Sequence, residues 1–152
     1  SIPLMIVRGD LDFVLIESVG KKCGFLERAV QELGLRAEVI NGRAEDLARS
    51  PAYRERFDVC CARAVARLNT LAEYCVPFVR PGGRFIAYKG EAAEEIAEAE
   101  NAFRTLGVRL SAAEKRELPE NAGSRTIVVA EKLHKTPAAY PRGKGKERSR
   151  PL

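Results

Sequence analysis

The sequence is poor in the side chains on which many hydrolases and metal enzymes depend. It contains one histidine and four cysteines, and no two cysteines have the CxxC spacing of a zinc site. The lone His134 stands in a charged stretch, which leaves a Cys–His nucleophile pair with little support. We therefore expect no metal site, and we interpret Cys23, Cys60, Cys61 and Cys75 as reduced, packed thiols of a cytoplasmic protein.

Long hydrophobic runs are also absent. No stretch reaches the roughly 18 apolar residues that a membrane-spanning helix needs. No signal-peptide pattern is present either, although the chain opens at Ser1 rather than at a methionine. A chain of 152 residues with 45% hydrophobic content is large enough to bury the core of one domain. We expect no membrane partner, and nothing in the sequence implies an oligomer.

Positive charge is concentrated at one end of the chain. The formal net charge is +5, yet residues 132–152 alone hold seven Lys or Arg and one Glu, so the rest is nearly neutral. Such a basic tail is often no more than a solvated terminus. It also suits a polyanionic partner, because each neutralised phosphate releases counterions.

Strand-like and helix-like patterns alternate along the chain. Strands are predicted at 12–17, 37–41, 57–62 and 84–88, and helices at 21–33, 65–75 and 91–106. Two edge strands are predicted at 109–118 and 125–131, joined by a polar turn. This order indicates an α/β domain over 1–133, with a mostly parallel sheet and helices on both faces. Residues 134–152, rich in Pro, Gly, Lys and Arg, should form an irregular tail.

The carboxyl ends of the predicted strands define a candidate site. Ligands in such sheets bind just beyond these ends, which selects Glu17 and the segments 41–45, 62–63 and 88–90. A strand-end carboxylate such as that of Glu17 can hold both hydroxyls of a ribose. It can equally cap the helix that begins near Lys21, and spacing alone leaves both readings open.

Several longer runs resemble one protein family. They are LIESVGKKCGFLERAVQELGL, GRAEDL, FDVCCARAVARLNTLAEYCVPFVRPGGRFIAYKG and the terminal YPRGKGKERSRPL. In this order, and over nearly the whole chain, they resemble the glucose-inhibited division protein B family of bacterial 16S rRNA (guanine-N7) methyltransferases. The resemblance implies a class I S-adenosylmethionine-dependent methyltransferase fold, which is Rossmann-like. It also implies methyl transfer to N7 of a guanine in 16S rRNA of the small ribosomal subunit.

The same resemblance assigns cofactor contacts residue by residue. It implies that Glu17, Ser18 and Val19 lie at the ribose of S-adenosylmethionine, Ala44 and Glu45 at its adenine, and Arg63 at a further point. Arg63 and Lys89 are also candidates for positioning the substrate, through the cofactor carboxylate or an RNA phosphate. Their structural alternatives are an ion pair with a neighbouring acid and an ordinary solvated lysine. Tyr88 is suited to stacking on a base, or to packing in the sheet.

The sequence departs from the family pattern at its start. The glycine-rich loop that follows the family's first strand is absent, and residues 1–7 resemble the helix that comes after it. The implied strand order is 3-2-1-4-5-7-6, so the first, central strand is lacking. Without it, strands 2 and 4 would face a gap of about 9 to 10 Å, since neighbouring strands lie ~4.8 Å apart. We therefore expect a fragment that is inactive by itself.

Two other functions fit part of the sequence. A nicotinamide-dependent dehydrogenase would use a strand-end acid equally well, although no GxGxxG loop is present. A non-catalytic RNA-binding domain would explain the basic tail but not the strand-end residues. For the methyltransferase we expect the tail to be mobile until it contacts rRNA phosphates. The cations expected to make those contacts are Lys135, Arg142, Lys144, Lys146, Arg148 and Arg150.

Overall fold

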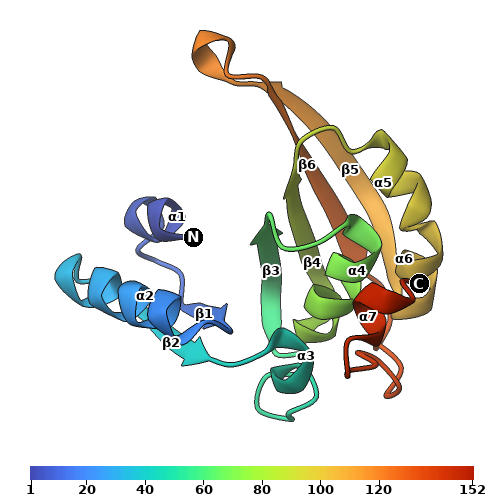
Figure 1. Cartoon of the computed structure of the whole chain (residues 1–152), viewed down its shortest axis with the longest axis horizontal. Coiled ribbons are helices and arrows are strands. Elements are labelled where there is room, and N and C mark those ends of the chain that lie inside the picture. Colours follow the sequence, from blue (N-terminus) through green and yellow to red (C-terminus); the bar gives the residue numbers. More distant parts are fainter. The chain divides into compact units, whose positions relative to one another are not determined.

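The computed structural model describes all 152 residues, and they form two compact units. Unit 1 comprises Ser1–Asp46 and unit 2 comprises Leu47–Leu152. Each unit has its own sheet (Figure 1). None of the helices is long and apolar enough to cross a membrane.

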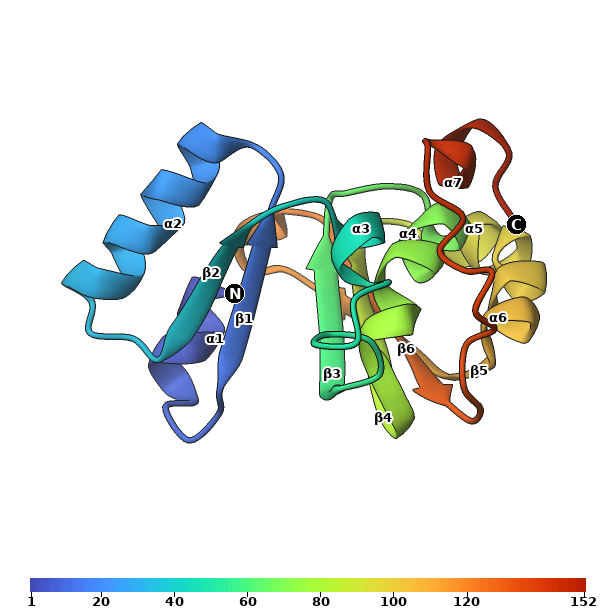
Figure 2. The ribbon, with the colours of Figure 1, turned by 90° about the horizontal axis from the view of Figure 1, so that it is seen from below.

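Unit 1 is a short β-α-β arrangement preceded by a helix. Helix α1 (Ile2–Val7) leads into β1 (Phe13–Glu17), α2 (Gly20–Glu32) and β2 (Ala37–Asn41). Figure 2 shows that β1 and β2 run in the same direction, and Glu17 pairs in register with Asn41. Helix α2 packs on both strands and buries Cys23. The two strands therefore end at one edge of this sheet, as the sequence predicts.

Unit 2 contains a four-stranded sheet in the order β3-β4-β6-β5. Its strands are β3 (Phe57–Arg63), β4 (Val79–Lys89), β5 (Val108–Glu117) and β6 (Ser124–Lys132). The pair β3–β4 is parallel, and β6 is antiparallel to both β4 and β5. This order corresponds to the 4-5-7-6 part of the strand order that the resemblance implies, and the β1–β2 pair of unit 1 corresponds to its strands 2 and 3.

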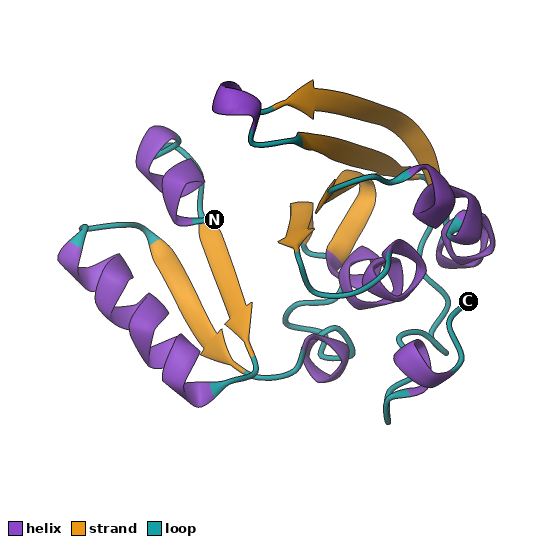
Figure 3. Ribbon diagram, turned by 45° about the horizontal axis from the view of Figure 1, so that its top comes forward, coloured by secondary structure: helices purple, strands orange, loops and turns teal.

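Helices cover the sheet of unit 2 and complete its core. These are α4 (Leu68–Cys75), α5 (Ala93–Glu98) and α6 (Glu100–Leu106), with α4 and α6 side by side (Figure 3). Helix α4 is buried over its whole length and contributes Leu68 and Leu71 to the core. Phe85 of β4 and Leu106 of α6 are also among the largest fully buried side chains. Short helices at α3 (Ala44–Leu47), η1 (Val76–Phe78), η2 (Pro119–Asn121) and α7 (Lys146–Ser149) complete the elements.

Most predicted elements are confirmed, but several differ in their bounds or position, and the helix predicted at 91–106 is divided into α5 and α6. The helix predicted at 65–75 begins only at Leu68, because Ala64 has a positive φ of 55° that ends β3 without starting a helix. The strand predicted at 84–88 begins earlier, at Val79, so that residues 81–83 are part of β4 at a register irregularity beside β3. A side chain at Gly83 would come within 2.5 Å of the Asp58 carbonyl, so only glycine permits this approach of the two strands.

The prediction of two edge strands is half wrong. Strand β5 is an edge strand, but β6 lies between β4 and β5. Its alternating buried positions include Val128 and Ala130, each fully buried. The sequence of β6 alternates as in any half-buried strand, and this local pattern is the same for an interior strand and an edge strand.

The tail predicted at 134–152 is largely irregular but is not detached. Arg54 of unit 2 donates hydrogen bonds to the carbonyl oxygens of Tyr140 and Thr136, both at 2.8 Å. Thr136, Pro141 and Glu147 are buried, and Figure 1 shows α7 beside α4. The expectation of a mobile tail is therefore wrong for this structure. Long-range polar contacts and the burial of Pro141 replace the apolar side chains that the segment lacks.

Candidate functional site

The candidate site of unit 1 lies at the carboxyl ends of β1 and β2. The carbonyl oxygen of Glu17 accepts hydrogen bonds from the Asn41 side-chain amide and from the Gly42 N–H, each at 3.0 Å. The last residue of β2 and the first residue after it therefore fix the backbone at the end of β1. This contact places Glu17, Ser18 and Val19 next to the chain that continues into Ala44 and Glu45.

Only one oxygen of the Glu17 carboxylate accepts a hydrogen bond from the local backbone. Its Oε1 accepts a hydrogen bond from the Val19 N–H at 2.8 Å, directly before α2 begins. No protein donor contacts Oε2. The capping alternative is thus realised by one oxygen, while the other is free to accept a hydrogen bond from a hydroxyl.

Glu45 lies on α3, at the other side of the same strand ends. Its side chain is 12% exposed, and Arg43 Nε is 3.6 Å from its carboxylate. Ser18 and Val19 are exposed, and Ala44 is half-buried. Unit 1 thus brings together the five residues for which the resemblance implies contacts to the ribose and the adenine.

In unit 2, Arg63 ends β3 as an exposed cation without a protein partner. It is paired in register with Tyr88 of β4, and its guanidinium makes no hydrogen bond or ion pair. The structural alternative, an ion pair with a neighbouring acid, is therefore not realised. Tyr88 is 38% exposed and lies between Arg63 and Ile127 in the sheet, which leaves its ring partly open.

Lys89, by contrast, is fully engaged within unit 2. Its Nζ is 2.7 Å from Glu95 Oε2 and donates a hydrogen bond to the Ala66 carbonyl oxygen at 2.9 Å. The same Glu95 oxygen accepts the Leu68 N–H at the start of α4. Lys89 is only 10% exposed, so it acts on the loop that follows Arg63 rather than on a ligand directly.

The sequence gives little sign of the part that Glu95 plays. The acids at the start of the helix predicted at 91–106 fit the helix dipole equally well. Only the fold brings Glu95 to Leu68, 27 residues away along the chain.

Neither cysteines nor metal ligands form a reactive centre. All four thiols are free, and Cys23 and Cys75 are buried. A hydrogen bond with Cys60, together with burial, raises the pKa of the Cys75 thiol well above its usual value. No cluster of His, Cys, Asp or Glu that could hold a metal ion is present.

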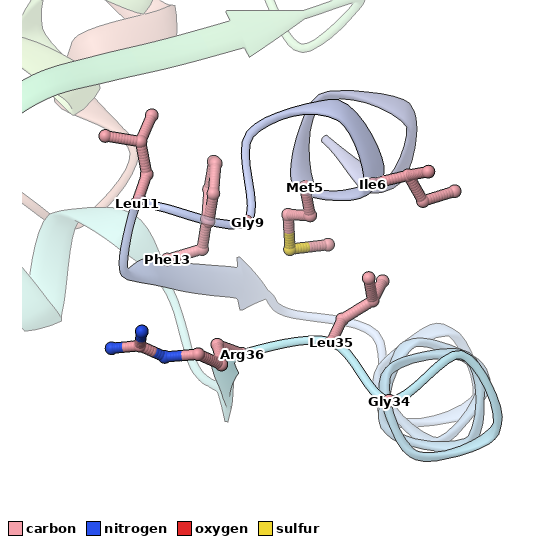
Figure 4. Close-up of a pocket in the computed structure, with 8 residues that line it drawn as sticks. All are labelled: Met5, Ile6, Gly9, Leu11, Phe13, Gly34, Leu35 and Arg36. Atoms are coloured by element: carbon pink, nitrogen blue, oxygen red, sulfur yellow. The ribbon is translucent and has the colours of Figure 1, made fainter.

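A cavity in unit 1 lies at the other end of its strands. It has a volume of about 240 Å³ and is lined by residues before β1 and before β2, with Met5, Phe13 and Leu35 facing it (Figure 4). Phe13 begins β1 and Leu35 precedes β2, so the cavity lies away from Glu17. Most of its side chains are apolar, and none of them is a carboxylate that could hold a ribose.

Comparison with known proteins identifies the family. Residues 1–124 match the family described as "GidB: rRNA small subunit methyltransferase G". The chain is 46% identical over its whole length to the ribosomal RNA small subunit methyltransferase G of Brevibacillus brevis, of which it covers 65%. It is also 46% identical to that of Symbiobacterium thermophilum, with 96% of this chain and 62% of the relative covered. The chain thus spans less than two thirds of these relatives.

Solved structures show the same fold at low sequence identity. M. jannaschii TYW2 in complex with AdoMet matches 86% of this chain and 61% of its own, with a TM-score of 0.60 and 16% identity. An rRNA methylase from Streptococcus thermophilus matches 84% of this chain and 78% of its own, with a TM-score of 0.59 and 18% identity. The fold is therefore that of class I S-adenosylmethionine-dependent methyltransferases, and the chain belongs to the rRNA small subunit methyltransferase G (GidB) family.

Proposed function

We propose that the intact protein transfers the methyl group of S-adenosylmethionine to N7 of a guanine in 16S rRNA. The observation that carries this proposal is the family membership, with 46% identity over the whole chain to a methyltransferase G. The substrate is 16S rRNA, free or in the small ribosomal subunit, and the place of action is the cytoplasm. The activity belongs to the intact protein, because the chain spans 65% of that relative.

The residues of unit 1 fit the nucleoside half of the cofactor. The free Oε2 of Glu17 is an acceptor for ribose hydroxyls, and the Ser18–Val19 backbone continues from it. Ala44 and Glu45 supply a small apolar side chain and a carboxylate for the adenine, at the end of the neighbouring strand. Arg63 is proposed as a further contact, since a planar guanidinium can bind a carboxylate through two hydrogen bonds.

The proposed reaction makes modest demands on side-chain chemistry. When bound, S-adenosylmethionine supplies a methyl group on a positively charged sulfur. Guanine N7 has an in-plane lone pair and carries no proton, so no general base is needed. The residues have to hold the base and the methyl group in line and exclude water, which is catalysis by positioning. This requirement agrees with candidate residues that bind and orient, Glu17 in unit 1 and Arg63 in unit 2, rather than with an acid–base pair.

The proposal is tested by incubating the intact protein with methyl-labelled S-adenosylmethionine and unmodified 16S rRNA. We expect label in the RNA as 7-methylguanosine, detected by nucleoside mass spectrometry after digestion. Calorimetric titration with S-adenosylmethionine, NAD and RNA separates the alternatives. Binding of NAD but not S-adenosylmethionine would indicate a dehydrogenase, and RNA binding without either cofactor would indicate a non-catalytic RNA-binding protein.

Replacement of Arg63 by lysine should lower the methylation rate by about 10- to 100-fold, the equivalent of one or two charge-assisted hydrogen bonds. Lysine keeps the positive charge but lacks the two-pronged donor of a guanidinium. The measurement is kcat/KM with 16S rRNA, and the matched control is Arg84→Lys, an exposed arginine at the amino end of the paired part of β4. Full activity in Arg63→Lys would mean that charge alone suffices.

A further inference from the structure

The C-terminal segment, 134–152, is held to unit 2 by a buried ion pair. The carboxylate of Glu73 on α4 is fully buried and accepts the Arg142 N–H at 2.8 Å. The Arg142 guanidinium donates a hydrogen bond from Nε to the same oxygen at 3.0 Å and one from Nη2 to the other oxygen at 2.7 Å. Such a two-pronged contact fixes the orientation of Arg142 as well as its position. Arg142 is therefore occupied by the protein and is not available to RNA.

A second contact anchors the segment closer to its end. Gly143, Lys144 and Gly145 all have positive φ, so the chain turns sharply there. The turn allows the Glu147 carboxylate to accept the Gly143 N–H. Glu147 is itself fully buried, and its carbonyl oxygen accepts a hydrogen bond from Thr70 Oγ1 at 2.9 Å. Helix α7 is thereby seated at the first turn of α4.

These contacts determine where the segment runs. It leaves β6 beside Arg84, where the pairing of β4 with β6 begins. Lys135 lies between the end of β6 and Thr136, whose N–H donates to Glu55 just before β3. It passes Glu73, then Thr70, and Arg148 Nη2 finally reaches the Val65 carbonyl oxygen at 3.3 Å. Val65 is two residues beyond the end of β3. The end of the segment thus lies at the same sheet edge as Arg63, while Lys135 lies at the opposite edge.

Burial also separates the acidic side chain of the segment from most of its basic side chains. Its only acid, Glu147, is buried inside the turn. The exposed charged side chains that follow Arg142 are all cations, and none of them forms an ion pair: Lys144, Lys146, Arg148 and Arg150. An exposed surface of one sign, with its acid hidden, fits a polyanion. The proximity to Arg63 makes the phosphate groups of the RNA substrate the matching partner.

We propose that this segment is a preformed RNA-docking surface at the Arg63 edge, in which Lys144, Lys146, Arg148 and Arg150 contact phosphates. Glu73 is a positioning residue that holds this surface in place through Arg142, and Lys135 takes no part. The inference rests on the proposed function, because it takes 16S rRNA as the partner. It differs from a mobile basic tail in making RNA affinity depend on a buried acid that never touches RNA.

The first test compares cations by measuring binding of 16S rRNA to the intact protein over a salt series. In the variant with Lys144, Lys146, Arg148 and Arg150 all replaced by alanine, the slope of log K against log salt should fall in magnitude by about 3, at roughly 0.7–0.9 per phosphate contact. Lys135→Ala is the matched control and should leave the slope unchanged. Equal slopes for the quadruple variant and the unaltered protein would overturn the proposal.

The second test asks whether Glu73→Gln strengthens or weakens the binding of RNA. This change removes a negative charge, so simple electrostatics predicts tighter binding to RNA. The proposal predicts the opposite, a loss of about tenfold in RNA affinity at low salt, as the loss of one to two phosphate contacts would give. It also predicts faster cleavage by trypsin after Lys144 and Lys146. Arg142→Lys keeps the positive charge but loses the two-pronged contact with Glu73, and it should also weaken RNA binding.

Unchanged or tighter RNA binding by a folded Glu73→Gln protein would refute the positioning role. Folding is checked through S-adenosylmethionine affinity, which should match that of the unaltered protein. If Glu73→Gln does not fold, the four-cation variant still decides the proposal, because its changes are all on the surface. The proposed function fails separately, if the unaltered protein neither methylates nor binds 16S rRNA.

Discussion

Replacing Lys132 with methionine should lower the free energy of unfolding by about 3–5 kcal/mol, the usual cost of breaking a buried ion pair. The Lys132 side chain is fully buried, and its Nζ is 3.0 Å from Glu55 Oε1. It also donates hydrogen bonds to the Val76 carbonyl oxygen at 3.0 Å and to Thr136 Oγ1 at 2.7 Å. Burial lowers the pKa of Lys132, and the ion pair with Glu55 opposes that shift. Methionine fills the space but removes the donor that these three acceptors share.

Urea unfolding followed by circular dichroism provides the measurement. The matched control is Lys135→Met, an exposed lysine three residues away whose side chain forms no hydrogen bond or ion pair, and we expect its effect to be within about 0.5 kcal/mol. Adding Glu55→Gln to Lys132→Met should cost less than the sum of the single changes, because the two groups interact. A Lys132→Met protein as stable as the control would show that the pair contributes nothing.

Glu55 also gives this network a pH dependence of known sign. Burial by itself raises the pKa of Glu55, but hydrogen bonds from the Thr136 N–H and Lys132, with the nearby charges, outweigh it and leave the pKa below its ordinary value of 4.5. The stabilisation from Glu55 is therefore present above pH 4.5 and is lost as the pH falls through the lowered value.

Glu17→Ala should weaken S-adenosylmethionine binding by about 1.5–3 kcal/mol, the value of a hydrogen bond to a charged group. That range corresponds to about a 10- to 150-fold rise in Kd. The physical reason is the loss of the free Glu17 Oε2 as an acceptor for ribose hydroxyls. Calorimetric titration of the intact protein measures the change, and Glu32→Ala, an exposed acid at the far end of α2, is the control.

The variant Glu17→Gln separates binding from capping. Glutamine can still accept the Val19 N–H through its amide oxygen, but it places an amide donor where Oε2 stands. We expect cofactor affinity to fall while thermal stability stays the same. Unchanged affinity in both Glu17 variants would reduce Glu17 to a helix cap and remove it from the cofactor site.

Local patterns in the sequence are enough to predict where most helices and strands lie and where the parallel strands end. The runs at 13–17, 37–41 and 57–63 are apolar, β-favouring and bounded by turn residues, so their backbone states follow from local patterns. The alternation of these runs with helices fixes a parallel arrangement, and parallel strands end at the same edge. Glu17, Glu45 and Arg63 are selected as candidates in this way, because a position just after a strand is a local property.

The tertiary structure decided which of these groups are free and which are engaged. Lys89 and Arg63 look alike as strand-end cations, yet Lys89 is paired with Glu95 and Arg63 has no partner. The basic tail has the composition of a mobile segment, but Glu73, 69 residues before Arg142, holds it against α4. Composition and periodicity report on neighbours in the chain. An ion pair forms between groups that folding brings within about 4 Å, whatever their separation in sequence, so only the fold selects its partner.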